Sequence, residues 1–250
     1  YVCCAHEQAA GFAADGYAKV RGLGVAVTTC GPGATNLMTA AASAYFENAP
    51  VLYLVGQQHV FQEIDVVSIF KPVTRFAKQV TDPESVVTDL NCALLAARSG
   101  PVLLNIFDEV YYAEIDGNVA GFGPPPPYAT PVVDHIFGNK RKALPPDADW
   151  SRTRGSVNPY HFMQQLNRVL GERAIVTDIG NHGVWVKQAS DRQVISDNNF
   201  GAMGYAIAAA MGVACASPYP PVACITGDGS IQMNIQELAT IAKHDMNIKI

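Results

Sequence analysis

The stretch Val25-Ala-Val-Thr-Thr-Cys-Gly-Pro-Gly33 decides the fold, because it leads from a short apolar strand into a turn. Gly and Pro together end regular structure, so the strand stops before Gly31. The chain then predicts a helix over Thr35–Glu47 and a second apolar strand over Val51–Val55. Short apolar strands separated by helices indicate a parallel sheet that helices cover on both faces.

The same alternation continues on both sides of this stretch. An Ala-rich helix is expected before it, over His6–Val20. A later helix opens at Asp82, a good N-cap, with Pro83 at its first position, and it runs to about residue 98. The strand Val102–Ile106 follows. The first half of the chain is therefore an α/β domain.

The second half repeats this pattern after a Pro-rich break. Gly117–Asp149 has no periodicity and includes a run of four prolines, which favours an extended linker or marks the place of a missing segment. Helices are expected over Pro159–Leu170 (N-cap Asn158), Asn181–Ala189, Ala202–Cys215 and Ile235–His244, and strands over Ala174–Thr177, Val222–Thr226 and Asn247–Ile250. We predict an α/β protein with two doubly wound parallel-sheet domains, residues 1–116 and 155–250, joined by residues 117–154.

Composition excludes several classes of protein. Of the 250 residues 49% are hydrophobic and 16% charged, which excludes a disordered chain, and the net charge of -5 argues against a nucleic-acid partner. The apolar stretch Ala202–Ala216 is shorter than the ~20 residues of a membrane span, and no secretory signal opens the sequence. Six cysteines without C-x-x-C spacing predict reduced, mostly buried thiols in a cytoplasmic protein. Since Tyr1 is not Met and the chain stops within an apolar stretch, we expect the sequence to be incomplete.

Chemistry is expected at Gly227-Asp-Gly-Ser230, which follows a buried strand. In parallel α/β sheets ligands bind at this end of the strands. Glycines let backbone N–H groups approach a phosphate, and a carboxylate can hold Mg²⁺ against it. On these residues alone, an ordinary turn is an equally good reading.

The longer stretch Gly227-Asp-Gly-Ser-Ile-Gln-Met-Asn-Ile-Gln-Glu237 resembles the diphosphate-binding motif of acetolactate-synthase-like, thiamine-diphosphate-dependent enzymes. The resemblance implies the thiamine-diphosphate-binding fold for both domains. It implies that Asp228 binds Mg²⁺ and that Gly227, Gly229 and Ser230 contact the cofactor diphosphate. The Asn that completes the family motif would lie after Ile250.

His6-Glu-Gln-Ala-Ala10 resembles the segment of the same family that carries the catalytic glutamate, which implies that role for Glu7. The aminopyrimidine ring of the cofactor must become its imino tautomer to take the C2 proton. A carboxyl group hydrogen-bonded to the ring nitrogen promotes this, best when it is shielded from water. The alternative is a surface Glu that the helix dipole favours in a first turn.

Two further segments of the first half resemble family motifs. Thr29-Cys-Gly-Pro-Gly-Ala-Thr-Asn36 is similar to the T-S-G-P-G-x-x-N turn, which implies that Gly31, Pro32 and Gly33 line the pyrimidine end of the cofactor. Gln57 and the pair Phe61 and Gln62 are similar to residues of the substrate pocket. The loop between them is shorter than the family's, so we expect residues to have been left out near His59.

In the second half, Asp178-Ile-Gly-Asn-His182 resembles the family's D-x-G-Q-H, which implies that Gly180, Asn181 and His182 face the diphosphate. Phe200-Gly-Ala-Met-Gly204 resembles G-x-x-M-G, whose Met lies under the cofactor and forces its bent conformation, a role that falls on Met203. A packing His and a core Met are the alternatives.

The resemblance implies a carboligase of 2-oxo acids. The C2 carbanion attacks the keto carbon, CO₂ leaves, and the enamine attacks a second carbonyl. It also implies a homodimer or homotetramer. A simple decarboxylase and a non-catalytic remnant stay open, as does the acceptor, because Phe107-Asp108-Glu109 stands where many synthases carry a Lys. FAD is not expected, since the usual middle domain is not seen, and the lack of G-x-G-x-x-G after the first strand disfavours a Rossmann dehydrogenase.

Overall fold

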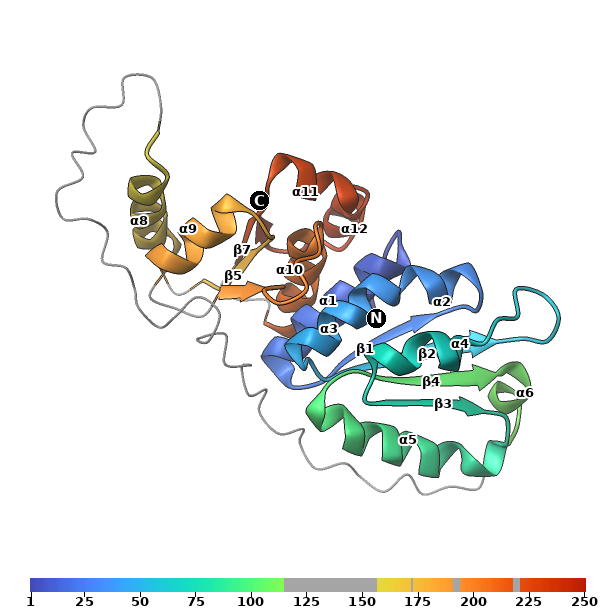
Figure 1. Cartoon of the computed structure of the whole chain (residues 1–250). Coiled ribbons are helices and arrows are strands. Elements are labelled where there is room, and N and C mark those ends of the chain that lie inside the picture. Colours follow the sequence, from blue (N-terminus) through green and yellow to red (C-terminus); the bar gives the residue numbers. More distant parts are fainter. Residues whose placement is uncertain (115–156, 172, 191–193, 218–220) are drawn as a thin grey trace.

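The computed structural model describes residues 1–114, 157–171, 173–190, 194–217 and 221–250 (Figure 1). Its described part holds two parallel sheets of four strands each, with helices packed on them. The predicted α/β class and the two doubly wound sheets are therefore confirmed. The Pro-rich segment predicted over residues 117–154 lies outside the described residues.

The first sheet has the strand order β1-β2-β4-β3, and neighbouring strands are parallel throughout. Its strands are β1 (Gly24–Thr28), β2 (Val51–Gln57), β3 (Phe76–Val80) and β4 (Val102–Phe107). Three of them match the predicted strands within two residues. The sequence did not predict β3, because this edge strand carries the exposed polar residues Lys78 and Gln79 in place of an apolar run.

The helices of the first half are α1 (Glu7–Arg21), α2 (Pro32–Asn36), α3 (Met38–Glu47), α4 (Val66–Phe70), α5 (Val86–Ala96) and α6 (Asp108–Tyr111). The single helix predicted over Thr35–Glu47 is wrong, since the chain breaks at Leu37 between α2 and α3. Asp82 does accept a hydrogen bond from Glu84 N, but the turn that it caps is a 3-10 turn before α5.

The second sheet has the strand order β6-β5-β7-β8, again parallel. Its strands are β5 (Ile175–Thr177), β6 (Val194–Ser196), β7 (Val222–Ile225) and β8 (Ile248–Lys249), and its helices are α8 (Pro159–Leu170), α9 (Asn181–Ala189), α10 (Tyr205–Ala216), α11 (Asp228–Met233) and α12 (Glu237–Lys243). Helix α10 starts after Gly204, not at Ala202, because Gly204 has a left-handed backbone with φ 85°.

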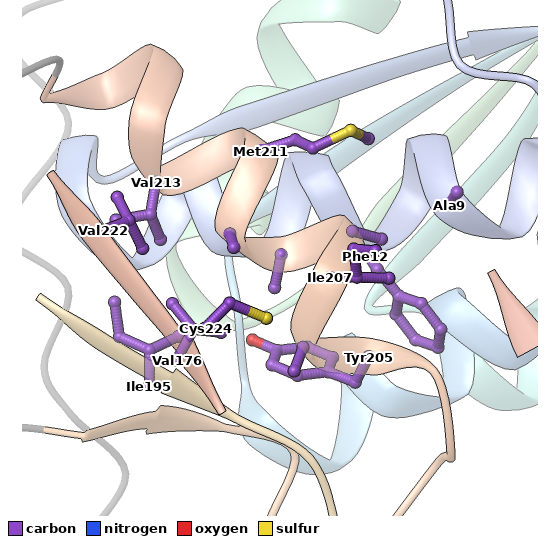
Figure 2. Close-up of a cluster of buried hydrophobic side chains, with 14 of the residues drawn as sticks. Ala9, Phe12, Val176, Ile195, Tyr205, Ile207, Met211, Val213, Val222 and Cys224 are labelled. Atoms are coloured by element: carbon purple, nitrogen blue, oxygen red, sulfur yellow. The ribbon is translucent and has the colours of Figure 1, made fainter. Parts of the chain in front are cut away.

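Helices α1 and α10 lie against each other between the two sheets (Figure 1). A Cβ atom added to Gly16 would collide with the backbone carbonyl of Ala209, and one added to Gly212 would collide with that of Ala13. Around this contact Phe12 and Tyr205 pack edge to face, with ring centroids 5.4 Å apart (Figure 2). The small residues therefore bring the two backbones together at the centre of the molecule.

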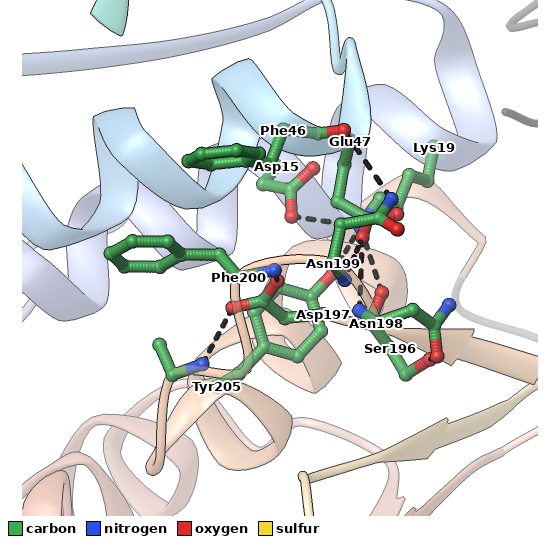
Figure 3. A network of polar contacts seen from close by, with 11 residues as sticks. Asp15, Lys19, Phe46, Glu47, Ser196, Asp197, Asn198, Asn199, Phe200 and Tyr205 are labelled. Carbon is green, nitrogen blue, oxygen red and sulfur yellow. Dashed lines mark hydrogen bonds and ion pairs between the residues drawn. The ribbon is translucent and has the colours of Figure 1, made fainter. Parts of the chain in front are cut away.

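Charged groups surround the same contact (Figure 3). Lys19 Nζ donates to Asp15 Oδ2 at 3.0 Å, to Tyr205 Oη at 2.8 Å and to the Ser196 carbonyl at 3.2 Å. Glu47 Oε1 accepts from the backbone N–H groups that follow Asp197, and Phe46 stacks on Phe200 with centroids 5.6 Å apart. Burial raises the pKa of Asp15, and Lys19 opposes that rise.

The predictions about the cysteines and about membrane-spanning segments can be compared with the structure. The cysteines are free thiols as predicted, but only Cys30 and Cys224 are buried, so the expectation of mostly buried thiols is wrong. Within the described ranges, no helix has the length and apolar character that crossing a bilayer requires.

Candidate active site

Glu7 occupies the first turn of α1, where its carboxyl group is half-buried. Asn36 Nδ2, at the end of α2, donates to Glu7 Oε2 at 3.0 Å. A Cβ atom on Gly33 would stand 3.6 Å from Glu7 Oε1, so Gly33 lies directly beside this oxygen. The structure thus brings together Glu7 and the glycine turn, which lie far apart in the sequence.

The start of α1 is held from the second half of the chain. Glu237, fully buried in α12, accepts hydrogen bonds through Oε1 from Ala5 N at 2.9 Å and His6 N at 3.1 Å. Its other oxygen accepts from Thr240 Oγ1 at 2.8 Å. Three donors compensate for the burial of this carboxyl group and fix the backbone that leads into Glu7.

The turn at Gly31 contacts the segment after β2. Gly31 has φ 56°, and a Cβ atom there would lie 2.7 Å from Gln62 Cβ, so the position requires glycine. Phe61 and Gln62 are exposed, as is Pro32. Gln57 at the end of β2 is buried, and its Oε1 has no hydrogen-bond partner. The predicted substrate residues therefore lie near the glycine turn, with one unsatisfied acceptor among them.

A second group of predicted residues converges at the carboxyl ends of β5 and β7. Cβ atoms added to Gly180 and Gly227 would lie 2.9 Å and 3.1 Å from His182 Cε1, and one on Gly229 would lie 3.3 Å from Met203 Cε. Met203 is 45% exposed, so the reading of a core Met does not hold. The His182 ring therefore packs on Gly180 and Gly227, and Met203 packs on Gly229.

Asp178 joins the segments that carry these residues. Its side chain is buried and accepts from Ala206 N and Thr226 Oγ1, which ties the end of β5 to α10 and to the segment after β7. Beside it, His182 Nε2 is buried without a hydrogen-bond partner. Burial lowers the pKa of His182, although Asp178 acts against this, so the imidazole is neutral near pH 7.

Backbone donors of two helices point out of the same sheet end. The N-cap of α9 is Gly180, and no side chain satisfies the N–H groups of its first turn, which includes Asn181. Asp228 is exposed at the first position of α11, while Ser230 is buried. Among the described residues no three His, Cys, Asp or Glu side chains gather as a metal site. This arrangement suits an anion that brings its own metal ligands.

Two family models match the chain over these two regions. The N-terminal TPP-binding domain of thiamine pyrophosphate enzymes matches residues 1–69, and the C-terminal TPP-binding domain matches residues 178–250. The chain belongs to the thiamine pyrophosphate enzyme family. The first match includes Glu7 and the glycine turn, and the second includes Asp178, Met203 and Asp228.

Curated relatives place this thiamine pyrophosphate enzyme in the acetolactate-synthase-like group. The acetolactate synthase of Arthrospira platensis is 24% identical over 421 residues, covering 98% of this chain and 73% of that protein. A probable acetolactate synthase large subunit of Methanocaldococcus jannaschii is 41% identical over 127 residues, 46% of this chain and 22% of that protein. A probable chloroplastic acetolactate synthase of Oryza sativa subsp. japonica is 24% identical over 98% of this chain and 64% of its own length. The alignments over 421 residues exceed the 250 residues of this chain, so those relatives are longer within the matched span.

Membership of the family makes thiamine diphosphate the cofactor, typically with Mg²⁺, as predicted. The residues at the second sheet end fit its diphosphate. The unpartnered Nε2 of His182, the uncapped start of α9 and the bare glycines offer space and donors for an anion. The family assignment and the fit agree on the same sheet end.

Sequence reasoning assigned no role to three residues that shape the site. Asn36 and Asp178 lay inside motifs that were matched, yet neither pattern shows which group each side chain contacts. Glu237 is 231 residues from His6 in the chain, and no local signal could have paired them. Within the described residues no hydrogen bond joins the group around Glu7 directly to the group around Asp228; Glu237, Lys19 and Glu47 are among the residues that join the two halves of the chain.

Proposed function

We propose that this acetolactate-synthase-like enzyme is a carboligase that decarboxylates a 2-oxo acid and transfers the remaining fragment to a second carbonyl compound. The observation that carries the proposal is the Glu7 carboxyl group, half-buried beside the glycine turn, with Oε2 held by Asn36. Within the described residues no hydrogen bond reaches its Oε1, so this oxygen is available to a bound cofactor ring.

The proposed site residues act at two sheet ends, and those of the first sheet serve the pyrimidine end of the cofactor and the substrate. When bound, thiamine diphosphate supplies a nucleophilic carbon and an electron sink for the loss of CO₂. Glu7 donates and accepts the proton at the pyrimidine nitrogen, and Gly31, Pro32 and Gly33 line that end of the cofactor. Gln57, Phe61 and Gln62 face the 2-oxo acid, and the unpartnered Oε1 of Gln57 accepts a hydrogen bond from a hydroxyl group of the reacting substrate or from water.

The diphosphate end uses donors and one carboxylate. Gly180, Asn181, His182, Gly227, Gly229 and Ser230 bind the diphosphate, and Asp228 ligates the Mg²⁺ that neutralises it. Met203, exposed over Gly229, supports the cofactor between the two ends. A neutral His182 donates or accepts a hydrogen bond there without adding charge.

The names of the relatives support the substrate class, because an acetolactate synthase is named for forming acetolactate. As in the family, Glu7 and Asp228 would meet across a subunit interface, which makes the active protein a homodimer or homotetramer. Residues 1–116 and 155–250 would then form the pyrimidine-binding and diphosphate-binding domains. We place the protein in the cytoplasm.

A simple 2-oxo acid decarboxylase is the second candidate, and one observation favours it. His59 Nε2 lies 3.2 Å from Glu109 Oε1, just after β4, where Asp108 adds another carboxylate. Asp108 and Glu109 stand where many synthases carry a Lys, so this position supplies no cation for the carboxylate of a second 2-oxo acid, and a proton then takes the place of a carbonyl as acceptor.

The deciding experiment measures CO₂ release from pyruvate by the protein with thiamine diphosphate and Mg²⁺, beside a Glu7→Gln variant. We expect cofactor-dependent release, acetolactate among the products, and a loss of at least ~100-fold in the variant, as for a general acid–base group. Acetaldehyde as the sole product would favour the decarboxylase. Full activity of Glu7→Gln would refute the role of Glu7, and no release with any 2-oxo acid would leave a non-catalytic remnant.

A further inference from the structure

We infer that Asn36 is a positioning residue that decides which oxygen of Glu7 carries the shared proton, an inference that rests on the proposed role of Glu7. Asn36 Nδ2 donates to Glu7 Oε2 at 3.0 Å. The described residues offer no donor to Oε1, which lies beside Gly33. The two oxygens of the carboxyl group therefore have different surroundings.

This difference fixes the location of the proton. In a neutral carboxyl group the carbonyl oxygen is a better acceptor than the hydroxyl oxygen, so an amide N–H that points at Oε2 favours the carbonyl form of Oε2. When Glu7 is neutral, its proton therefore resides on Oε1. That oxygen is the one to which no described residue donates, so the proton is on the oxygen that is left for the cofactor ring.

The position of Asn36 at the end of α2 explains why its contact with Glu7 is rigid. Asn36 ends α2, whose start is the glycine turn itself, and Leu37 after it is fully buried. Thr35 N donates to the Gly31 carbonyl at 3.0 Å, which closes the turn on the helix. The amide is thus carried by the same short element that lines the cofactor, and Glu7 is aligned to that element by a hydrogen bond to a charged group.

The hydrogen bond between Asn36 and Glu7 should affect proton transfer more than it affects folding. Asn36 and Glu7 are both only partly buried, so loss of the amide leaves no fully desolvated group behind. Loss of a hydrogen bond to a charged group corresponds to a rate change on the order of 10- to 100-fold if it is needed for the productive orientation. Asn36→Ala should show this change in proton transfer and little change in stability.

The test measures hydrogen–deuterium exchange at C2 of thiamine diphosphate in the holoenzyme, by acid quench and proton NMR. It compares the native protein, Asn36→Ala, Glu7→Gln and the double variant. Asn36→Asp has the same shape but no N–H donor, and Thr35→Ala is the matched control, because exposed Thr35 contacts Pro32 and not Glu7. Cofactor affinity by calorimetry and the melting temperature of the apoprotein are measured for each variant.

We expect Asn36→Ala and Asn36→Asp to slow the exchange on the order of 10- to 100-fold, with cofactor affinity and melting temperature close to those of Thr35→Ala. In the Glu7→Gln background the same change should have no further effect, because a residue that acts through Glu7 is silent without it. Native exchange in Asn36→Ala, or an equal slowing with and without Glu7, overturns the inference alone. Native exchange in Glu7→Gln overturns the proposed function instead.

Discussion

Polar side chains at the contact between α1 and α10 differ in their hydrogen bonding from those at the sheet end around His182. At the helix contact Lys19 is almost fully buried and meets three acceptors, although Asp15 Oδ1 there has no partner. Before the start of α1, Glu237 of α12 meets three donors. At the sheet end His182 Nε2 has no partner, Asp228 is exposed, and Met203 lies open over Gly229. Satisfied buried groups stabilise a fold, whereas unsatisfied ones at a rigid edge are available to a ligand. The difference predicts that changes in the first region cost stability and changes in the second cost cofactor binding.

The largest effect should come from Lys19→Met. Asp15 is fully buried, and without Lys19 its charge would be uncompensated, which costs ~3–5 kcal/mol of unfolding free energy. Thermal and urea unfolding measure this loss, and Lys243→Met is the control, since Lys243 is exposed on α12. Equal stability of the two variants would show that the buried pair does not support the contact between the helices.

Gly212→Ala should have the next largest effect. Its Cβ would collide with the backbone carbonyl of Ala13, so α1 and α10 would have to separate, at a cost of ~1–3 kcal/mol. Gly56→Ala is the matched control, because the nearest atom to its Cβ would be Thr28 O at 3.7 Å, an ordinary contact. If Gly212→Ala melts no lower than Gly56→Ala, the close approach of the two helices is not as described.

Asp228→Asn tests the sheet end, where we expect a loss of cofactor binding and not of stability. Asp228 is exposed, so the variant should keep its stability within ~0.5 kcal/mol. Its affinity for thiamine diphosphate at limiting Mg²⁺ should fall by about tenfold, equal to ~1.4 kcal/mol, and recover partly at high Mg²⁺. Calorimetric titration at two Mg²⁺ concentrations checks this, with Asp245→Asn, exposed in the same domain, as control. Unchanged affinity at both concentrations would remove Asp228 from the metal site.

The smallest effect concerns pH. Burial lowers the pKa of His182 below its ordinary value of 6.5, so the folded protein favours the neutral imidazole. Stability from this group is present above pH 6.5 and is lost as pH falls from there toward the lowered folded pKa. The melting temperature of the apoprotein should therefore fall more steeply than that of His182→Asn between about pH 7 and pH 5. Parallel curves for the two proteins would contradict the burial of the imidazole.

The sequence predicted the strands that are short and apolar and failed where that signal was absent. Strands β1, β2, β4, β5 and β7 were expected within a few residues of their observed bounds, because buried parallel strands are continuous apolar runs. Strand β3 carries Lys78 and Gln79 and does not stand out from a loop, and the short strand β6 (Val194–Ser196) was also missed. The break at Leu37 depends on how α2 packs beside Glu7, which local propensity does not encode.

The sequence by itself determined the fold class, because periodicity is a local property of a chain, and its motifs at the strand ends indicated the family by resemblance. Only the tertiary structure decided that Asn36 holds one oxygen of Glu7, that Glu237 anchors the start of α1, and that His182 Nε2 has no partner. These facts depend on which side chains meet across tens to hundreds of residues, and that is settled when α1 packs against α10. Glu7 was found from its motif, but its orientation comes from the packing.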